Sequence, residues 1–374
     1  MANILDYLAW RGDITLAQSP FNPVDNLVFS VISYLRFEGL VSEDFSAKGI
    51  TFAEASPLLQ KAALNEKSER MQQHVEFFIK AAATPRFADC RLSGYHAHFD
   101  KEAETQFAAV TITCTDGTHY VAFRGTDATV VGWKEDFNMS FMTPVPAQKL
   151  ALEYLEAAAR KLRGRIKLGG HSKGGNLAFY AAAFCKAGVQ RRVLAVYNND
   201  GPGFDERVIA EPGFQAIGDR LFDFVPQSSV IGMLLEHAEQ YTVVESTQRG
   251  IAQHDPYSWS VLGPGFVCKE TITDTSKFVD TAIKDWLKEI SPAERERFID
   301  ALFSVLEATE ITNFSELSGN WFQRAKAMGE ALKNMDEGTK KMLLKTLSLL
   351  FDTVKQNLRL LVPFMPNGKQ EGAR

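Results

Sequence analysis

The chain has 374 residues, a net charge of −5 and 45% hydrophobic residues, which predict either one large α/β domain with an appendage or two modest domains. The acidic balance argues against a nucleic-acid-binding protein, which would carry a basic excess. The sequence contains no apolar run of membrane-spanning length and no leader typical of secretion. The widely spaced cysteines indicate free thiols, and we therefore expect a cytoplasmic protein. These cysteines are Cys90, Cys114, Cys185 and Cys268.

Residues 1–85 are expected to form a helical N-terminal part of the main domain. The segment 26–35 is almost entirely apolar and follows Asn22-Pro23, which suits the start of a buried helix. The segment 67–83 has apolar residues every three or four positions, which is also helical spacing.

Residues 86–272 are expected to form an α/β core. An apolar strand at 107–114 is followed by the hairpin signal Asp116-Gly117 and a returning strand at 119–123. Helices and strands then alternate, which predicts a mostly parallel sheet with helices on both faces. The expected helix is 147–162, and the further expected strands are 165–169, 193–197, 220–225 and 241–244.

Residues 273–374 are expected to form a helical C-terminal region. Ser291-Pro292-Ala293-Glu294 combines a capping box with proline at the first helical position. The segment 340–361 has an apolar face flanked by basic residues, including Lys355 and Arg359. Such a helix either packs on the domain or lies on a membrane surface, and we expect the former.

The most informative motif is Gly170-His171-Ser172-Lys173-Gly174-Gly175, between a predicted strand and a predicted helix. Glycines two residues before and after a serine at such a junction predict a nucleophile elbow. The turn lifts the serine hydroxyl clear of the sheet, and the helix start offers free N–H groups to an oxyanion. A glycine-rich junction with an idle serine is the alternative.

A serine nucleophile needs a base and an orienting acid. His254 lies in a loop after the last predicted strand, which suits the base, whereas His237 lies in a predicted helix and suits a surface role. Among the acids, Asp223 lies near the end of an apolar strand and fits the orienting role. Asp200 ends the preceding strand and is the reserve candidate for the acid, although we expect it to be an Asp-Gly turn residue instead.

The oxyanion donors are expected to be the backbone N–H groups of Thr126 and Lys173, with the Thr126 hydroxyl as a possible third donor. Thr126 lies in the loop Phe123-Arg124-Gly125-Thr126 after a predicted strand. Arg124 is expected either to form a surface salt bridge or to fix this loop by bonding backbone carbonyls.

These motifs together resemble the class 3, or fungal-type, lipase family of α/β-hydrolases over residues 105–260. The resemblance includes Trp133 and Asp136 after the Thr126 loop, and Asp223-Phe224-Val225-Pro226 followed by His254. Because the D-x-V-P pattern marks the acid in that family, the resemblance implies Asp223. A bacterial branch of uncharacterised proteins, described as a domain of unknown function, shares Gln253-His254-Asp255.

The resemblance implies a serine hydrolase that cleaves a carboxylic ester through Ser172, His254 and Asp223, without metal or cofactor. Where the family commonly has leucine, this chain has Lys173, which either favours anionic substrates or points to solvent. A thioesterase or amidase would use the same parts, and a non-catalytic binding scaffold is the alternative from another class. The expected partner is a small-molecule or lipid ester, with membrane contact not favoured and acyl length, head group and oligomeric state left open.

Overall fold

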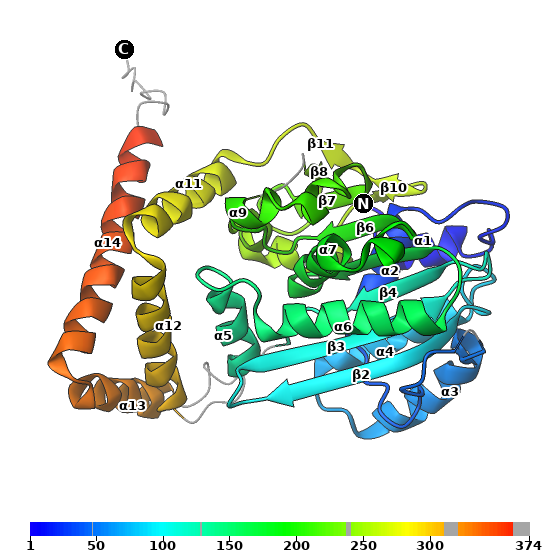
Figure 1. Cartoon of the computed structure of the whole chain (residues 1–374), viewed down its shortest axis with the longest axis horizontal. Coiled ribbons are helices and arrows are strands. Elements are labelled where there is room, and N and C mark those ends of the chain that lie inside the picture. The colour runs from blue at the N-terminus through cyan, green and yellow to red at the C-terminus, as the bar shows by residue number, and fades with distance from the viewer. Residues whose placement is uncertain (47, 128, 237–240, 310–320, 362–374) are drawn as a thin grey trace, which may run out of the picture.

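The computed structural model describes residues 1–46, 48–127, 129–236, 241–309 and 321–361. Its centre is a nine-stranded sheet with the order β1-β2-β3-β4-β5-β6-β7-β8-β11 (Figure 1). A separate hairpin pairs β9 (Val261–Leu262) with β10 (Gly265–Phe266). The strands of the large sheet are β1 (Ile50–Thr51), β2 (Arg91–Asp100), β3 (Thr105–Thr113), β4 (His119–Phe123), β5 (Ile166–His171), β6 (Val193–Asn199), β7 (Leu221–Pro226), β8 (Thr242–Val244) and β11 (Cys268–Lys269).

The sheet is mixed rather than mostly parallel. The neighbours from β4 to β8 are parallel, whereas β1 to β4 and the edge pair β8–β11 are antiparallel. The predicted α/β class is therefore confirmed in this coarser form. Sequence analysis missed β2, because its second half is exposed and a register shift between Ser93 and His96 interrupts the alternation of side chains.

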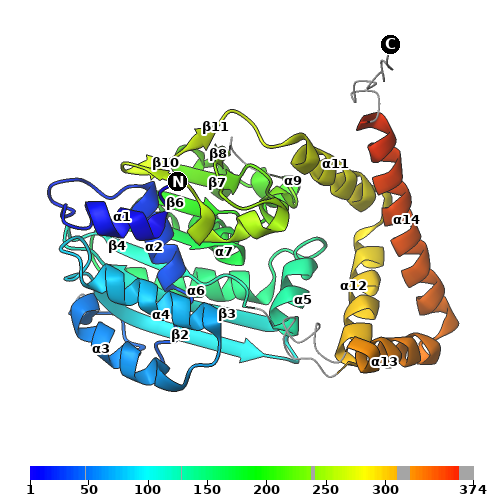
Figure 2. The same cartoon turned by 180° about the vertical axis from the view of Figure 1, so that it is seen from behind.

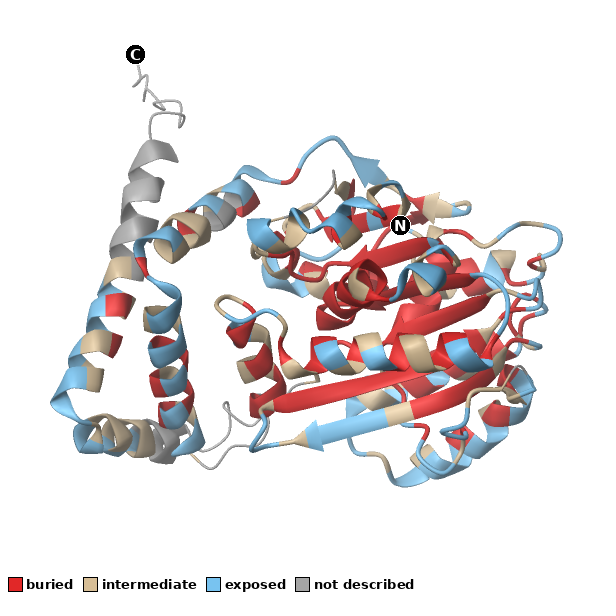
Figure 3. Cartoon of the chain, viewed as in Figure 1, coloured by how far each residue is buried: buried red, intermediate tan, exposed pale blue. Residues whose placement is uncertain are grey.

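Helices cover both faces of the sheet, as the alternation of elements predicted. One face carries the core formed with α1 (Ile4–Arg11), α2 (Pro23–Ile32), α3 (Phe52–Ala62) and α4 (Glu69–Ala82) (Figure 2). The other face is covered by α6 (Pro146–Lys161), α7 (Lys173–Phe184) and the short α10 (Pro212–Gln215). Most of the central strands are buried (Figure 3), and two further short helices are α8 (Ala187–Gln190) and α9 (Glu206–Ile209).

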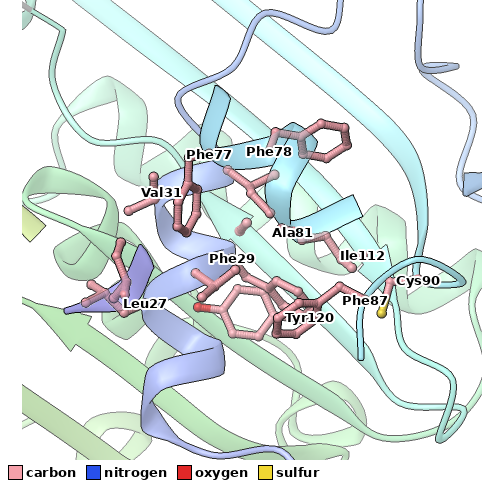
Figure 4. Close-up of a cluster of buried hydrophobic side chains, with 14 of the residues drawn as sticks. Leu27, Phe29, Val31, Phe77, Phe78, Ala81, Phe87, Cys90, Ile112 and Tyr120 are labelled. Carbon is pink, nitrogen blue, oxygen red and sulfur yellow. The ribbon is translucent and has the colours of Figure 1, made fainter. Parts of the chain in front are cut away.

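The core beneath the N-terminal helices is aromatic. Phe29 of α2 packs edge-on against Tyr120 of β4, with ring centroids 5.3 Å apart (Figure 4). Fully burying such a side chain contributes about 1.5–3 kcal/mol. Asp25 and Arg86 form an ion pair in which both side chains are completely buried, and the Tyr7 hydroxyl donates to Asp25 at 2.7 Å. The polar contacts join α1 and α2 to the segment after α4, and the contact between Phe29 and Tyr120 holds α2 against the sheet.

The C-terminal region consists of α11 (Asp274–Glu289), α12 (Pro292–Glu307), α13 (Trp321–Asn334) and α14 (Glu337–Leu361). The predicted capping box is present, since Ser291 and Glu294 bond each other's backbone N–H groups. Helix α12 packs against α5 (Val130–Asn138) (Figure 1), where Phe137 and Phe303 contact with ring centroids 5.8 Å apart. Within the described ranges, no helix combines the length and hydropathy needed to cross a bilayer.

Candidate active site

Ser172 occupies the turn between β5 and α7, with φ 58° and ψ −136°. A non-glycine residue pays about 1–3 kcal/mol for such a backbone conformation, which concentrates at functional sites. The flanking glycines are required by close approach: a Cβ on Gly170 would lie 2.3 Å from the carbonyl carbon of Gly174. A Cβ on Gly174 would lie 2.2 Å from the Phe123 carbonyl oxygen. The structure therefore contains the strained strand-to-helix turn that the motif predicts.

His254 is paired with Asp200. The His254 Nδ1 atom lies 2.6 Å from Asp200 Oδ2, at the end of the short 3₁₀ segment Gly250–His254. Asp200 directly follows β6, is fully buried and has φ 57°. Its other oxygen accepts bonds from the Ser229 hydroxyl and, at 3.2 Å, from the Gly232 N–H. A carboxylate held in this way fixes the proton of the imidazole on Nδ1 and leaves Nε2 as the basic nitrogen.

The choice of Asp223 as the acid partner of His254 does not agree with this geometry. Asp223 lies inside β7, where its neighbour across the ladder to β6 is Asn198. Asp200 is two residues beyond Asn198, so Asp223 lies about 7 Å further back along the strand direction. The residue that reaches the imidazole is Asp200, which sequence analysis held only in reserve.

Ser172 and His254 line the same cavity. Among the described residues, no hydrogen bond joins the Ser172 hydroxyl to the imidazole, whose Nδ1 bonds to Asp200. Catalytic hydrogen bonds of this kind are often long in unliganded enzymes and tighten in the substrate complex. The structure thus brings the predicted nucleophile and base to one site without joining them directly.

His171 holds the loop that carries His254. Its Nε2 lies 2.7 Å from the His254 carbonyl oxygen, which can only accept, so Nε2 carries the proton. Nδ1 then accepts from the Tyr34 hydroxyl at 2.9 Å. Burial lowers the pKa of His171 well below its usual value, which keeps the ring neutral. Sequence analysis treated His171 only as part of the elbow motif and gave no signal for this contact.

The backbone N–H groups expected to bind an oxyanion are available. Within the described residues, neither the Thr126 N–H nor the Lys173 N–H donates to a protein acceptor. The Thr126 hydroxyl, however, donates to Asp136 Oδ2 and is therefore engaged, contrary to the idea of a third donor. Burial raises the pKa of Asp136 to about 6. Gly125 is also required here, because a Cβ would lie 2.4 Å from the His171 carbonyl oxygen.

The Lys173 side chain neither reaches solvent nor lines the cavity that contains Ser172. It is fully buried, with Nζ 2.8 Å from Glu135 Oε2 and 3.6 Å from Asp136 Oδ1. Glu135 also accepts from the Ala147 N–H at 2.9 Å. Lys173 therefore links α7 to α5 directly and to α6 through Glu135. The ammonium group was expected either to favour anionic substrates or to point to solvent, and it does neither, because it is buried against Glu135. A contact between residues so far apart in the sequence leaves no local pattern.

The Arg124 side chain lines the cavity. In the described part of the chain its guanidinium forms neither the salt bridge nor the carbonyl bonds that sequence analysis considered, and its Nε has no partner. His237 falls outside the described residues, as do the side chains of Lys355 and Arg359.

A buried polar network that sequence analysis missed lies behind the elbow. The Asn199 side chain donates to the Gly170 carbonyl oxygen at 2.9 Å, and its backbone carbonyl accepts from the Ser172 N–H at 2.9 Å. Asn26 of α2 donates to Asn199 Oδ1 at 2.8 Å, and Tyr120 donates to Asn26 Oδ1 at 2.7 Å. The available signal was an asparagine inside the apolar segment 26–35.

The cavity has a volume of about 1000 Å³ and is lined from two sides. Ser172, Thr126 and His254 lie on the side formed by the sheet and its loops. The opposite side comes from the C-terminal helices, which contribute Arg295 and a larger set of apolar residues: Ile283, Trp286, Leu287, Phe298, Ile299, Leu302 and Leu347. A search of the described residues for His, Cys, Asp and Glu groups able to hold a metal ion finds none.

Fold and site together define an α/β protein with a serine and an aspartate directly after the parallel strands β5 and β6, and a histidine in the segment that follows β8. Residues 81–304 match the Mbeg1-like family, and the chain belongs to this family. The family is lipase-like and of unknown function. No curated protein matches the chain, and no solved structure does. The matched segment includes Ser172, Asp200 and His254 and ends within α12.

Proposed function

We propose that the protein is a serine hydrolase of the α/β-hydrolase type that cleaves a carboxylic ester. The observation that carries this proposal is the pairing of the buried Asp200 with the half-buried His254, which lines the same cavity as a serine in a strained turn. A strained backbone and a buried carboxylate both reduce the stability of the folded protein. They occur together with an oriented imidazole where a serine is activated as a nucleophile.

In the acylation step, Ser172 Oγ attacks the ester carbonyl carbon while His254 Nε2 takes the hydroxyl proton. Asp200 keeps the other ring proton on Nδ1 and stabilises the imidazolium that forms. The N–H groups of Thr126 and Lys173 bind the oxyanion of the tetrahedral intermediate, where one such donor is worth roughly 10²–10³ in rate. His254 then gives its proton to the leaving alcohol, and an acyl-enzyme remains on Ser172.

In the deacylation step, water attacks the acyl-enzyme and His254 accepts its proton. The same oxyanion donors act again, and collapse of the intermediate returns the proton to Ser172 Oγ and releases the acid. No step requires a metal or an organic cofactor.

The motifs that resemble class 3 lipases agree with this proposal in the elbow, in the Thr126 loop and in His254. They differ in the acid, because the D-x-V-P aspartate of the resemblance corresponds to Asp223, whereas Asp200 contacts the imidazole. We therefore assign Asp200 to the catalytic set.

A fluorophosphonate probe tests the proposal on the full-length protein, since it labels only an activated serine. We expect labelling of the wild type, loss of labelling in Ser172→Ala, and unchanged labelling in Ser140→Ala, a control serine that lines the same cavity. Hydrolysis of nitrophenyl butyrate should follow the same pattern. A folded wild-type protein that is neither labelled nor active would identify a non-catalytic binding scaffold instead.

A further inference from the structure

The C-terminal helices close the cavity on the side opposite Ser172. Seven apolar side chains from α11, α12 and α14 face the same cavity as Ser172 and His254. Phe298 and Ile299 of α12 are almost completely buried, while Leu302, one turn further on, is only partly covered. The cavity therefore extends from Ser172 and His254 to a mainly apolar surface on the C-terminal helices, which also includes Arg295.

This apolar wall is held in place rather than loosely attached. The Trp286 indole N–H donates to the Thr346 carbonyl oxygen at 3.3 Å, and its ring packs edge-on against Phe298 with centroids 5.6 Å apart. Lys134 of α5 pairs with Asp300 of α12 at 3.0 Å. Helix α5 also carries Asp136, which bonds to Thr126. The same helix therefore contacts both the apolar wall and the loop that contains Thr126.

A cavity of about 1000 Å³ is at the upper end of the range for small-molecule sites. An apolar wall of this kind binds apolar groups and offers water few partners. A short acyl group on Ser172 would leave most of the wall uncovered, whereas a long chain would cover it.

We propose that α11, α12 and α14 form the acyl-binding wall of the enzyme, so that the substrate is an ester of a long-chain acyl group. This inference rests on the proposed function. Each methylene buried against the wall strengthens binding about fourfold. The helices, rather than the elbow and its loops, thus set the preferred chain length.

Nitrophenyl esters from acetate to palmitate test the inference on the full-length protein. For the wild type, kcat/KM should rise by about fourfold per methylene until the wall is covered and then level off. Leu302→Trp narrows the cavity and should lower kcat/KM for palmitate at least about tenfold, the equivalent of two lost methylenes, while acetate hydrolysis changes less than about twofold. The control is Leu344→Trp on α14, which is 52% exposed and lies outside the cavity, and it should match the wild type.

Binding separates this inference from the proposed function. Inactive Ser172→Ala protein should bind a fluorescent long-chain fatty acid, and Leu302→Trp in that background should weaken the binding while Leu344→Trp should not. Should Leu302→Trp fail to fold by circular dichroism, Leu347→Phe narrows the same wall from α14. A flat chain-length profile in an active enzyme, or equal losses on acetate and palmitate in a folded Leu302 variant, would overturn the acyl wall. Absence of probe labelling with intact fatty-acid binding would instead overturn the hydrolase.

Discussion

Replacing Asp200 by asparagine separates the two candidate acids. Asn tolerates the left-handed backbone that Asp200 adopts at φ 57°. Its side-chain oxygen can still accept from Ser229 and from the Gly232 N–H. The amide N–H₂ would then face His254 Nδ1, which must become an acceptor, and the ring proton moves to Nε2. An Nε2–H cannot take the Ser172 proton.

The expected loss is therefore one of rate rather than of fold. Converting the orienting acid to its amide in a Ser-His-Asp site lowers kcat by about 10⁴, the equivalent of about 5.5 kcal/mol in activation free energy. The assay is nitrophenyl butyrate hydrolysis at pH 8, with the thermal midpoint as a check on folding. Asp223→Asn is the matched control, one strand away and also buried, and should stay within about tenfold of wild type, well short of the loss expected for the orienting acid.

Two outcomes would refute the reasoning. One is a folded Asp200→Asn protein that retains more than a tenth of the activity. The other is an Asp223→Asn protein that folds and loses as much activity as Asp200→Asn, which would restore the acid implied by the motif.

Three further perturbations have definite expected outcomes. Ser172→Gly and Ser172→Ala should both be inactive, but the free energy of unfolding should be about 1 kcal/mol higher for the glycine variant, because φ 58° strains alanine and not glycine. Denaturant titration measures this difference, and equal stability of the two variants would contradict the strain at this position. Because burial raises the pKa of Asp136 to about 6 from 3.8, the folded protein holds a proton between about pH 4 and 6 that the unfolded chain has lost. Its unfolding free energy should fall as pH rises through that window, by up to about 3 kcal/mol from this group, and Asp136→Asn should remove that component; parallel curves would argue against it. Arg86→Met leaves the Asp25 carboxylate buried without its ion-pair partner and should lower the free energy of unfolding by about 3–5 kcal/mol. Urea unfolding measures this loss, and a loss below about 1 kcal/mol would show that the ion pair is not isolated from water.

Local sequence patterns predicted the parts of the site that depend on neighbouring residues. The elbow follows from glycines two positions on each side of Ser172, and the structure contains that turn. The helices on both faces follow from the alternation of elements. Capping boxes are equally local, and Ser291 begins α12 as expected.

The parts that failed depend on register and on distant contacts. Asp200 and Asp223 both follow or lie in apolar strands, and only the pairing of β6 with β7 shows which one reaches His254. A single sequence carries no such register, and the motif of the resembling family pointed to Asp223, whereas Asp200 is the residue that contacts His254. The Lys173–Glu135 pair joins residues 38 positions apart, so the burial of that ammonium group had no local signal either.

Asn199 gives the active site a mechanical property. Its side chain donates to the Gly170 carbonyl oxygen and its backbone carbonyl accepts from the Ser172 N–H, both on the strand side of the turn, while the next residue is Asp200 itself. Ser172 and Asp200 are thus both fixed by Asn199, which is in turn hydrogen-bonded to Asn26 of α2. When the N-terminal helices detach from the sheet on heating, the protein should therefore lose activity as well. The temperature of inactivation and the temperature at which these helices melt should coincide.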